Sequence, residues 1–405
     1  YDPLLVRQML SQLSYASICR RILNDLLIIS QEKNVVKHFF RFFKKLFFEV
    51  YFWLKYNKKC RLAVVLEVGM EKKSAKIVLC GYYGRGNFGD EVILSQILNK
   101  IHTSIAGYQL DLRVLRTKSP TDVLSALRGA DVFIFGGGSL LQNATSDASL
   151  FYYVALIGLA RLSARHLLML SNGIGPIKDG ILPRRASVRL LGWAAAQFDE
   201  ISVRDGSSLA LLNKIIPSKK VKIVHDPAFC CFKGKEINQQ LINSKYFVYV
   251  PCSGQAGNEG ELVRWLRALK GHSHKECVVL VLNPREDLRL AKMLASSLSG
   301  RVLVAKRVSE VKSLLCGASF VISQRYHGTL FASGCGSPVA AVSDDPKMRA
   351  LCLELGVKLA RVGDSPETFS HLQAVDRAVI SRLATSADSE LSSVFAELKN
   401  LLRSK

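Results

Sequence analysis

KIVLCGYYGRGNFGDEVIL, residues 76–94, runs from an apolar strand pattern through a glycine-rich turn into a helical pattern. Gly84, Gly86 and Gly89 have the GxGxxG spacing that opens many dinucleotide-binding domains. A strand, a glycine turn and a helix in this order begin a βαβ unit. The stretch therefore predicts an α/β domain that starts here, with a ligand site at the turn.

The acidic residues of this stretch argue against a bound dinucleotide. The carboxylate that holds the ribose is expected about 20 positions on, at the end of the next strand, whereas Asp111 begins its strand. Asp90 and Glu91 stand at the helix start, where they would repel a pyrophosphate. They could instead accept hydrogen bonds from sugar hydroxyls, and one could act as a general base. The alternative is that Asp90 and Asn87 only cap the helix.

Outward from this stretch, apolar strands alternate with helical patterns along the chain. The expected strands are 76–80, 111–115, 131–135, 166–170, 200–203 and 221–224, followed by 246–251, 277–282, 301–304, 320–323 and 339–342. This rhythm predicts parallel sheets with helices on both faces. The chain is therefore expected to be α/β, with two Rossmann-like domains that face each other across a cleft. Ligands of such sheets bind outside the carboxyl ends of strands.

Composition divides the chain into four segments. Residues 76–235 form the expected first Rossmann-like domain, 246–375 the second, and 376–405 a C-terminal helix. Residues 1–75, in which Lys and Arg outnumber Asp and Glu 14 to 6, form a basic aromatic helical extension. Within it, residues 35–56 have a basic amphipathic pattern, which is typical of a membrane-surface helix. The alternative is a helix that docks its aromatic side on the main body.

The overall charge of +23 indicates an anionic partner. No zinc-finger spacing, homeodomain-like helix or RNA-binding aromatic signature is visible, so nucleic acid is not expected. The ten cysteines contain no CxxC pair and most lie in apolar segments, which indicates a reducing compartment and no zinc site. No apolar run reaches the ~18–20 residues of a membrane-spanning helix. Neither a metal nor a cofactor is expected.

Three further motifs follow strands of the first predicted domain. Residues 131–143, DVFIFGGGSLLQN, leave backbone N–H groups bare after a strand, and side chains beside them could bind a ligand. The alternative, which the motif taken alone favours, is a tight strand-to-helix turn with no ligand. The residues concerned are Gly136, Gly137, Gly138, Ser139 and Gln142. Arg204 in ISVRDGSSL has a planar fork that suits a carboxylate or phosphate, or it pairs with Asp205 on the surface. Asp226 in HDPAF reaches the cleft or only turns the chain.

The sharpest motif is VISQRYHGTLFASGCGSPVAAVSDDPK, residues 321–347. Arg325, Tyr326 and His327 follow a strand and open a helix, where an anion is held by Arg325 and free backbone N–H groups. The imidazole of His327 is suited to proton transfer near neutral pH. Lys347, after the next strand, could supply another positive charge.

In this order, the motifs resemble the polysaccharide pyruvyl transferase family, in particular its CsaB-type members, over residues 76–356. GYYGRGNFGDE, GGGSLLQ and GIGPI resemble its three glycine loops, and SVRD, RYHG and SDDPK its later motifs. Two departures are Asn143, where the family often has Asp, and Asp344, where an aromatic residue usually precedes DPK.

The resemblance implies a GT-B-like fold and phosphoenolpyruvate as donor. The product would be a pyruvate ketal on a cell-wall or other surface polysaccharide precursor, with a lipid-linked or polymeric sugar as acceptor. The enzyme would be cytoplasmic, and peripheral on the inner face of the cell membrane if residues 35–56 bind lipid. Arg204, Arg325, Tyr326 and Lys347 would bind the donor.

On this hypothesis, His327 is the acid, Asp90 or Glu91 is the base, and the glycine loops lie on the acceptor side. Two other classes of function fit the same residues. A GT-B-type glycosyltransferase would use the basic helix start for the diphosphate of a nucleotide-sugar. A non-catalytic membrane-associated binding protein would use the basic face as a tether.

Overall fold

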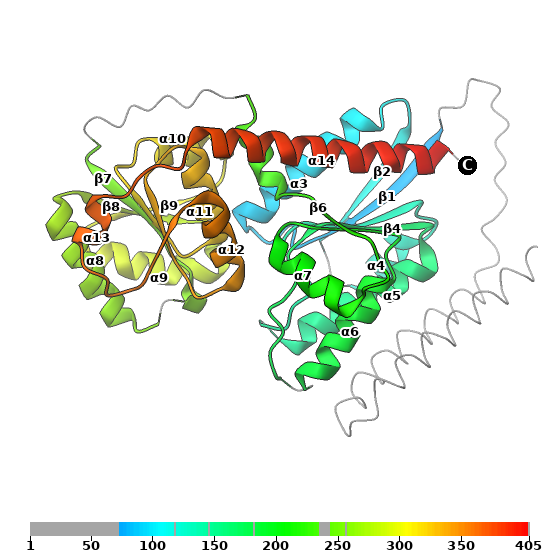
Figure 1. The fold of residues 1–405 in the computed structure, drawn as a ribbon, viewed down its shortest axis with the longest axis horizontal. Helices are drawn as coiled ribbons and strands as arrows, with labels where there is room; N and C mark the ends of the chain where they lie inside the picture. The colour runs from blue at the N-terminus through cyan, green and yellow to red at the C-terminus, as the bar shows by residue number, and fades with distance from the viewer. Residues whose placement is uncertain are drawn as a thin grey trace, which may run out of the picture. The chain divides into compact units, whose positions relative to one another are not determined.

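A computed structural model describes residues 73–116, 119–144, 146–180, 183–234, 244–255 and 257–403 (Figure 1). Nearly all of the predicted N-terminal extension lies outside these residues, and so does the predicted membrane-surface helix at 35–56.

The first sheet contains six strands from the N-terminal half of the described chain. Their order is β2 (Gln109–Leu115), β1 (Ser74–Cys80), β3 (Val132–Gly136), β4 (His166–Asn172), β5 (Glu200–Val203) and β6 (Val221–Ile223). The central strand β3, VFIFG, is buried at every residue. Continuous apolar runs of this kind are typical of parallel strands covered on both faces, and β3 pairs in parallel with both β1 and β4. The helices that join these strands are α3 (Phe88–Ser104), α4 (Pro120–Leu127), α5 (Asp147–Ser163), α6 (Arg184–Ala196) and α7 (Gly206–Ile215).

The second sheet repeats the arrangement. Its order is β12 (Lys358–Ala360), β11 (Val339–Val342), β10 (Val321–Ser323), β7 (Tyr246–Val250), β8 (Glu276–Val281) and β9 (Arg301–Val304), with every neighbouring pair parallel. Its helices are α8 (Glu259–Ser273), α9 (Pro284–Ser297), α10 (Val308–Cys316), α11 (Tyr326–Gly334), α12 (Pro346–Leu355), α13 (Glu367–Ser370) and α14 (Arg377–Arg403). Figure 1 shows α8 and α9 on one side of this sheet and α10 and α11 on the other.

All eleven predicted strands are confirmed within one or two residues at their ends. Strand β12 was not predicted, because it is three residues long and two of them are exposed. Such a strand carries no recognisable hydrophobic pattern.

The chain forms two compact units that interleave along the sequence. The first unit holds residues 73–80, 106–202 and 208–222 of the described chain, and the second holds the rest. The glycine turn and α3 therefore belong to the second unit, although they follow the first strand. The backbone N–H of Phe88 donates to Leu282 O at 2.9 Å, and its ring packs edge-on against Phe331. The predicted domain boundaries stay a prediction.

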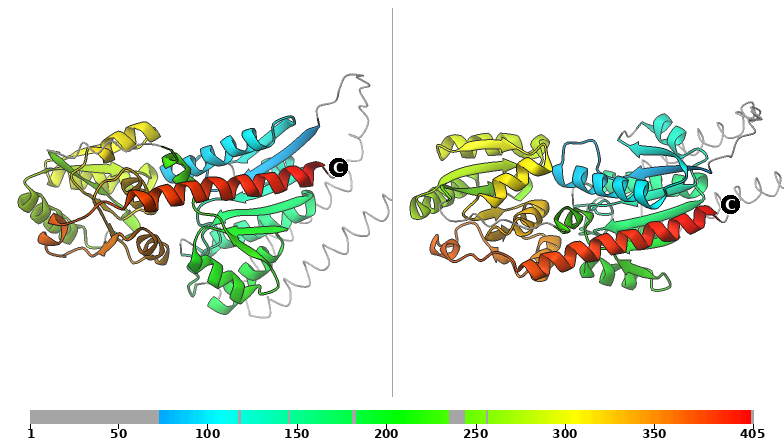
Figure 2. Two further views of the ribbon diagram at one scale, coloured as in Figure 1. Left: turned by 45° about the horizontal axis from the view of Figure 1, so that its top comes forward. Right: turned by 90° about the horizontal axis from the view of Figure 1, so that it is seen from above.

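Helix α14 packs lengthwise within the second unit. Figures 1 and 2 show it beside α3, and it also contacts the short 3-10 helix η1 (Pro227–Phe232). Asp388 on α14 forms an ion pair with Lys100 of α3, with Oδ1 2.5 Å from Nζ. It forms a second ion pair with Lys233 through Oδ2. Burial alone would raise the pKa of Asp388, but the two lysines outweigh it and lower that pKa. The carboxylate thus ties α14 to α3 and to the loop after η1.

His225 makes a second tie in the same unit. Its Nε2 lies 3.1 Å from Glu354 of α12, and its Nδ1 lies 2.9 Å from Glu390 of α14. Its backbone N–H also donates to Glu390 at 2.7 Å. The hydrogen bonds to Glu354 and Glu390 raise the pKa of His225 to about 9, although burial opposes them. The charged imidazole therefore holds α12 and α14 on the loop that carries Asp226.

The raised pKa of His225 predicts a pH-dependent stability. An unfolded histidine titrates near pH ~6.5, so the stabilisation is complete below that pH and is lost as the pH rises through about 9. Glu390→Gln removes one charged partner of His225. The decrease in the free energy of unfolding with rising pH should therefore be smaller by about 1–2 kcal/mol in this variant. Urea unfolding at pH 6.5 and pH 9.5 measures the difference. Equal pH dependence in wild type and variant would contradict the role of His225.

Candidate functional site

Three helix starts meet at the carboxyl edge of the second sheet. Helix α11 follows β10 and α9 follows β8, so both begin at this edge. Helix α3 joins them because Phe88 bonds Leu282, the residue after β8. A side-chain carbon at Gly86 would lie 4.0 Å from Pro284, the first residue of α9. Helix N-termini carry partial positive charge, and three of them at one edge favour an anionic ligand.

Arg204, Asp226 and His327 form one ion-paired cluster there. Asp226 Oδ2 lies 3.5 Å from Arg204 Nη1 and 3.5 Å from His327 Nε2. Its other oxygen accepts a 2.9 Å hydrogen bond from the backbone N–H of Ala228. The guanidinium of Arg204 stacks on the ring of Tyr326, with its carbon 4.2 Å from the ring centre. These four side chains and Asp90 are called the Asp226 cluster below.

The charges in the Asp226 cluster support one another although they are buried. Asp226 is 1% exposed and Arg204 is 4% exposed. Burial would raise the pKa of Asp226, but the hydrogen bond and charge of His327 and the charge of Arg204 outweigh it and lower that pKa. Asp226 is therefore an ionised carboxylate that orients both partners.

Asp90 completes the cluster from the first turn of α3. It is 7% exposed, and burial raises its pKa to about 6, with His327, Arg204 and Lys347 partly offsetting the shift. A carboxyl group with this pKa changes its protonation state near neutral pH. Gly89 lets α3 come this close, because a side-chain carbon there would lie 1.9 Å from His327 Nδ1.

The other predicted residues of the glycine turn shape the turn itself. Glu91 Oε1 accepts a 2.5 Å hydrogen bond from the backbone N–H of Gly84, and Asn87 caps α3 by accepting from Gly89. Gly84 and Gly86 have φ of 71° and 78°, which only glycine adopts easily. Glu91 thus closes the turn, and its role as a base stays a prediction.

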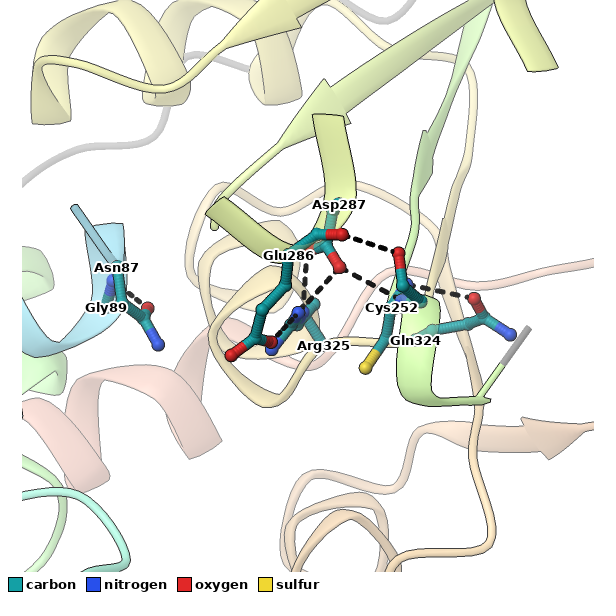
Figure 3. A network of polar contacts seen from close by, with 8 residues as sticks. Asn87, Gly89, Cys252, Glu286, Asp287, Gln324 and Arg325 are labelled. Atoms are coloured by element: carbon teal, nitrogen blue, oxygen red, sulfur yellow. Dashed lines mark hydrogen bonds and ion pairs between the residues drawn. The ribbon is translucent and has the colours of Figure 1, made fainter. Parts of the chain in front are cut away.

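Arg325 is held by two carboxylates of α9, as Figure 3 shows. Its Nε and Nη2 donate to the two oxygens of Asp287 at 2.9 and 2.7 Å, and Nη2 also donates to Glu286 at 2.7 Å. Burial opposes the charge of Arg325, but these partners outweigh it and raise its pKa. Neither Glu286 nor Asp287 was predicted, although NPRED also follows a strand and opens a helix. Donor binding by Arg325 stays a prediction.

Lys347 lies at the start of α12. Its ammonium group is 3.2 Å from Asp345, which caps this helix by accepting from the Lys347 backbone N–H. The charge of Lys347 offsets a small part of the rise that burial causes in the pKa of Asp90. Asp344, one of the two departures from the family pattern, is exposed and lies 3.4 Å from Arg349.

The second glycine loop lies at the carboxyl edge of the first sheet. Gly137 and Gly138 have φ of 66° and 72°, and Gly137 donates to Leu170 O at 2.9 Å. Gln142 accepts a 2.7 Å hydrogen bond from the backbone of Ala144. Gly136 is the last residue of β3 and Ser139 follows the two glycines, and the role of this loop in acceptor binding stays a prediction.

Asn143 fixes the end of this loop. Its amide donates to Asp147 and to Lys178 O, and its oxygen accepts from the Lys178 backbone N–H, each at 2.8 Å. An Asp here would lack the two N–H donors. The departure from the family pattern therefore has a structural use in this chain.

Within the described residues, no group of three or more His, Cys, Asp and Glu lies together as a metal site, and the prediction of a metal-independent reaction stays a prediction. No helix in the part of the chain that the structure describes is both long and apolar enough to cross a bilayer.

Among the solved structures with a similar fold are UDP-N-acetylglucosamine 2-epimerases. A Listeria monocytogenes protein described as a UDP-N-acetylglucosamine 2-epimerase is similar at a TM-score of 0.53 and 11% identity, over 82% of this chain and 98% of that chain. The UDP-GlcNAc 2-epimerase from Methanocaldococcus jannaschii gives 0.51 and 12%, over 80% and 99%. At such identities the likeness shows the fold alone, and it confirms the predicted α/β class with two Rossmann-like domains.

No curated protein matches the chain. The model of the polysaccharide pyruvyl transferase family matches residues 18–346, and its match includes the glycine turn, Arg204, Asp226 and the Arg325–His327 motif. Because this match covers most of the chain, the protein belongs to the polysaccharide pyruvyl transferase family, whose members are transferases.

Proposed function

We propose that the protein transfers pyruvate from phosphoenolpyruvate onto a sugar of a cell-surface polysaccharide precursor and forms a ketal. The observation that carries this proposal is the Asp226 cluster. It joins a histidine paired with a buried carboxylate to a second carboxyl group, Asp90, whose pKa is raised to about 6. The reaction needs an acid that protonates the enol carbon and a base that accepts the proton of the sugar hydroxyl.

The proposed reaction begins with protonation of the donor. His327, with Nε2 on Asp226, gives a proton from Nδ1 to the methylene carbon of phosphoenolpyruvate, and carbon 2 becomes electron-poor. A sugar hydroxyl attacks carbon 2 while Asp90 accepts its proton. A second hydroxyl of the sugar then displaces phosphate from carbon 2 and closes the ketal, and its proton leaves with the phosphate. Asp226 fixes the orientation of the imidazole through its contact with Nε2.

Positive charge for the donor comes from Arg325, with support from Arg204. Phosphoenolpyruvate carries a carboxylate and a phosphate, which suit guanidinium groups. Arg204 stacks on Tyr326, and Tyr326 lies between Arg325 and His327 in sequence, so both arginines flank one short segment. Lys347 adds charge near Asp90.

The acceptor we propose is a lipid-linked or polymeric sugar, and the place of reaction the cytoplasm, at the inner face of the membrane. This part rests on the likeness to CsaB-type members. The GT-B-type glycosyltransferase reading remains the second candidate, because the structural neighbours are nucleotide-sugar enzymes. A non-catalytic tether would not need the buried Asp226 cluster.

The donor assignment is tested by measuring phosphate release from phosphoenolpyruvate with a panel of lipid-linked sugars, and by mass analysis of the product. The expected product is heavier than the acceptor by a pyruvate less water. Binding of UDP-sugars without binding of phosphoenolpyruvate would favour a glycosyltransferase instead.

His327→Gln should lower kcat by about 100-fold or more, because the donor loses its proton source. Donor affinity should change little, since the glutamine keeps a polar group next to Asp226. Phosphate-release kinetics and calorimetry separate the two effects. A near wild-type kcat would remove His327 from the acid role.

Asp90 should set the acidic limb of the pH profile. A base acts only when ionised, so activity should rise with pH through about 6, the pKa to which burial raises this carboxyl. Asp90→Asn should abolish this limb together with most of the activity. The measurement is kcat from pH 4.5 to 8, and a limb that persists in the variant would assign it to another group.

A further inference from the structure

Each of the two arginines of the site pairs with two carboxylates of its own, and the four carboxylates differ sharply in exposure. Asp205 and Asp226 hold Arg204, with side chains 11% and 1% exposed. Asp287 and Glu286 hold Arg325, with side chains 0% and 50% exposed. Glu286 is therefore the carboxylate of this set that can leave its arginine for solvent without unpacking the protein.

Asp287 fixes Arg325 in place independently of Glu286. It accepts two hydrogen bonds from the guanidinium and a third, at 2.9 Å, from the backbone N–H of Ser253. Glu286 contributes one contact, to Nη2. The loss of this single ion pair costs little net free energy, because water solvates the half-exposed Glu286 and Asp287 still neutralises Arg325. Arg325 would keep its orientation after Glu286 has moved away.

The local charge shows why Glu286 matters for an anionic ligand. Arg325 contributes one positive charge, whereas Asp287 and Glu286 contribute two negative charges. These three side chains together carry one net negative charge, which opposes the attraction of the helix N-termini for an anion. With Glu286 displaced, Arg325 and Asp287 balance each other, and the Nη2 hydrogen that Glu286 held is free for a carboxylate or phosphate oxygen while Nη2 keeps its bond to Asp287.

We propose that Glu286 is a displaceable carboxylate that occupies the ligand position on Arg325 and sets the affinity of the enzyme for its anionic donor. The inference rests on the proposed function, since the donor is taken to be phosphoenolpyruvate. Donor binding exchanges one anion on Arg325 for another.

Titration calorimetry of the full chain with phosphoenolpyruvate tests the proposal. Glu286→Gln should bind the donor about 3- to 10-fold more tightly than wild type, because a like charge and a competitor are removed. Glu286→Ala serves as a second variant, and thermal melting checks that both are folded.

Glu310→Gln is the matched control. The side chain of Glu310 is 47% exposed and pairs with Arg307, so its replacement by Gln changes the net charge by the same amount as Glu286→Gln. Its donor affinity should equal that of wild type. Equal tightening in this control would reduce the effect to net charge and overturn the proposal.

The remaining outcomes separate the two proposals. If wild type binds phosphoenolpyruvate and neither Glu286 variant binds it more tightly, the role of Glu286 is wrong and the donor assignment stands. If neither wild type nor any variant binds phosphoenolpyruvate, the donor assignment fails and the role of Glu286 fails with it.

Discussion

The carboxylate of Asp226 is the constraint on which the site depends. It is buried and lies 3.5 Å from both Arg204 and His327, so it neutralises the guanidinium of Arg204 and orients the imidazole of His327. A buried ionised carboxylate persists only where such partners surround it. The arrangement joins residues more than a hundred positions apart, and the His225 ties hold the loop that carries Asp226 on α12 and α14.

A second constraint is the use of carboxylates as partners for the two arginines of the site. Arg204 and Arg325 each meet two acidic side chains. These partners keep the guanidinium groups oriented in a partly buried place. On the proposal for Glu286, an anionic substrate competes with this half-exposed carboxylate, and the affinity for the donor reflects that competition.

Much of the fold followed from the sequence, because parallel strands buried on both faces are continuous apolar runs. Strand β12 was missed since its residues are mostly exposed. The site motifs were found because each follows a strand, as Arg204, Asp226 and His327 do. Their pairing through one oxygen of Asp226 was not predictable, because it depends on how three loops pack. The carboxylates on Arg325 were missed although NPRED has the same position after a strand.

A crystal structure with phosphoenolpyruvate bound tests the central claim most directly. The account predicts an anionic group of the donor on Arg325, its carbon 3 facing His327, and the Asp226 contacts to Arg204 and His327 retained. Donor density away from both Arg325 and His327, or a donor that displaces Asp226 from His327, would contradict it.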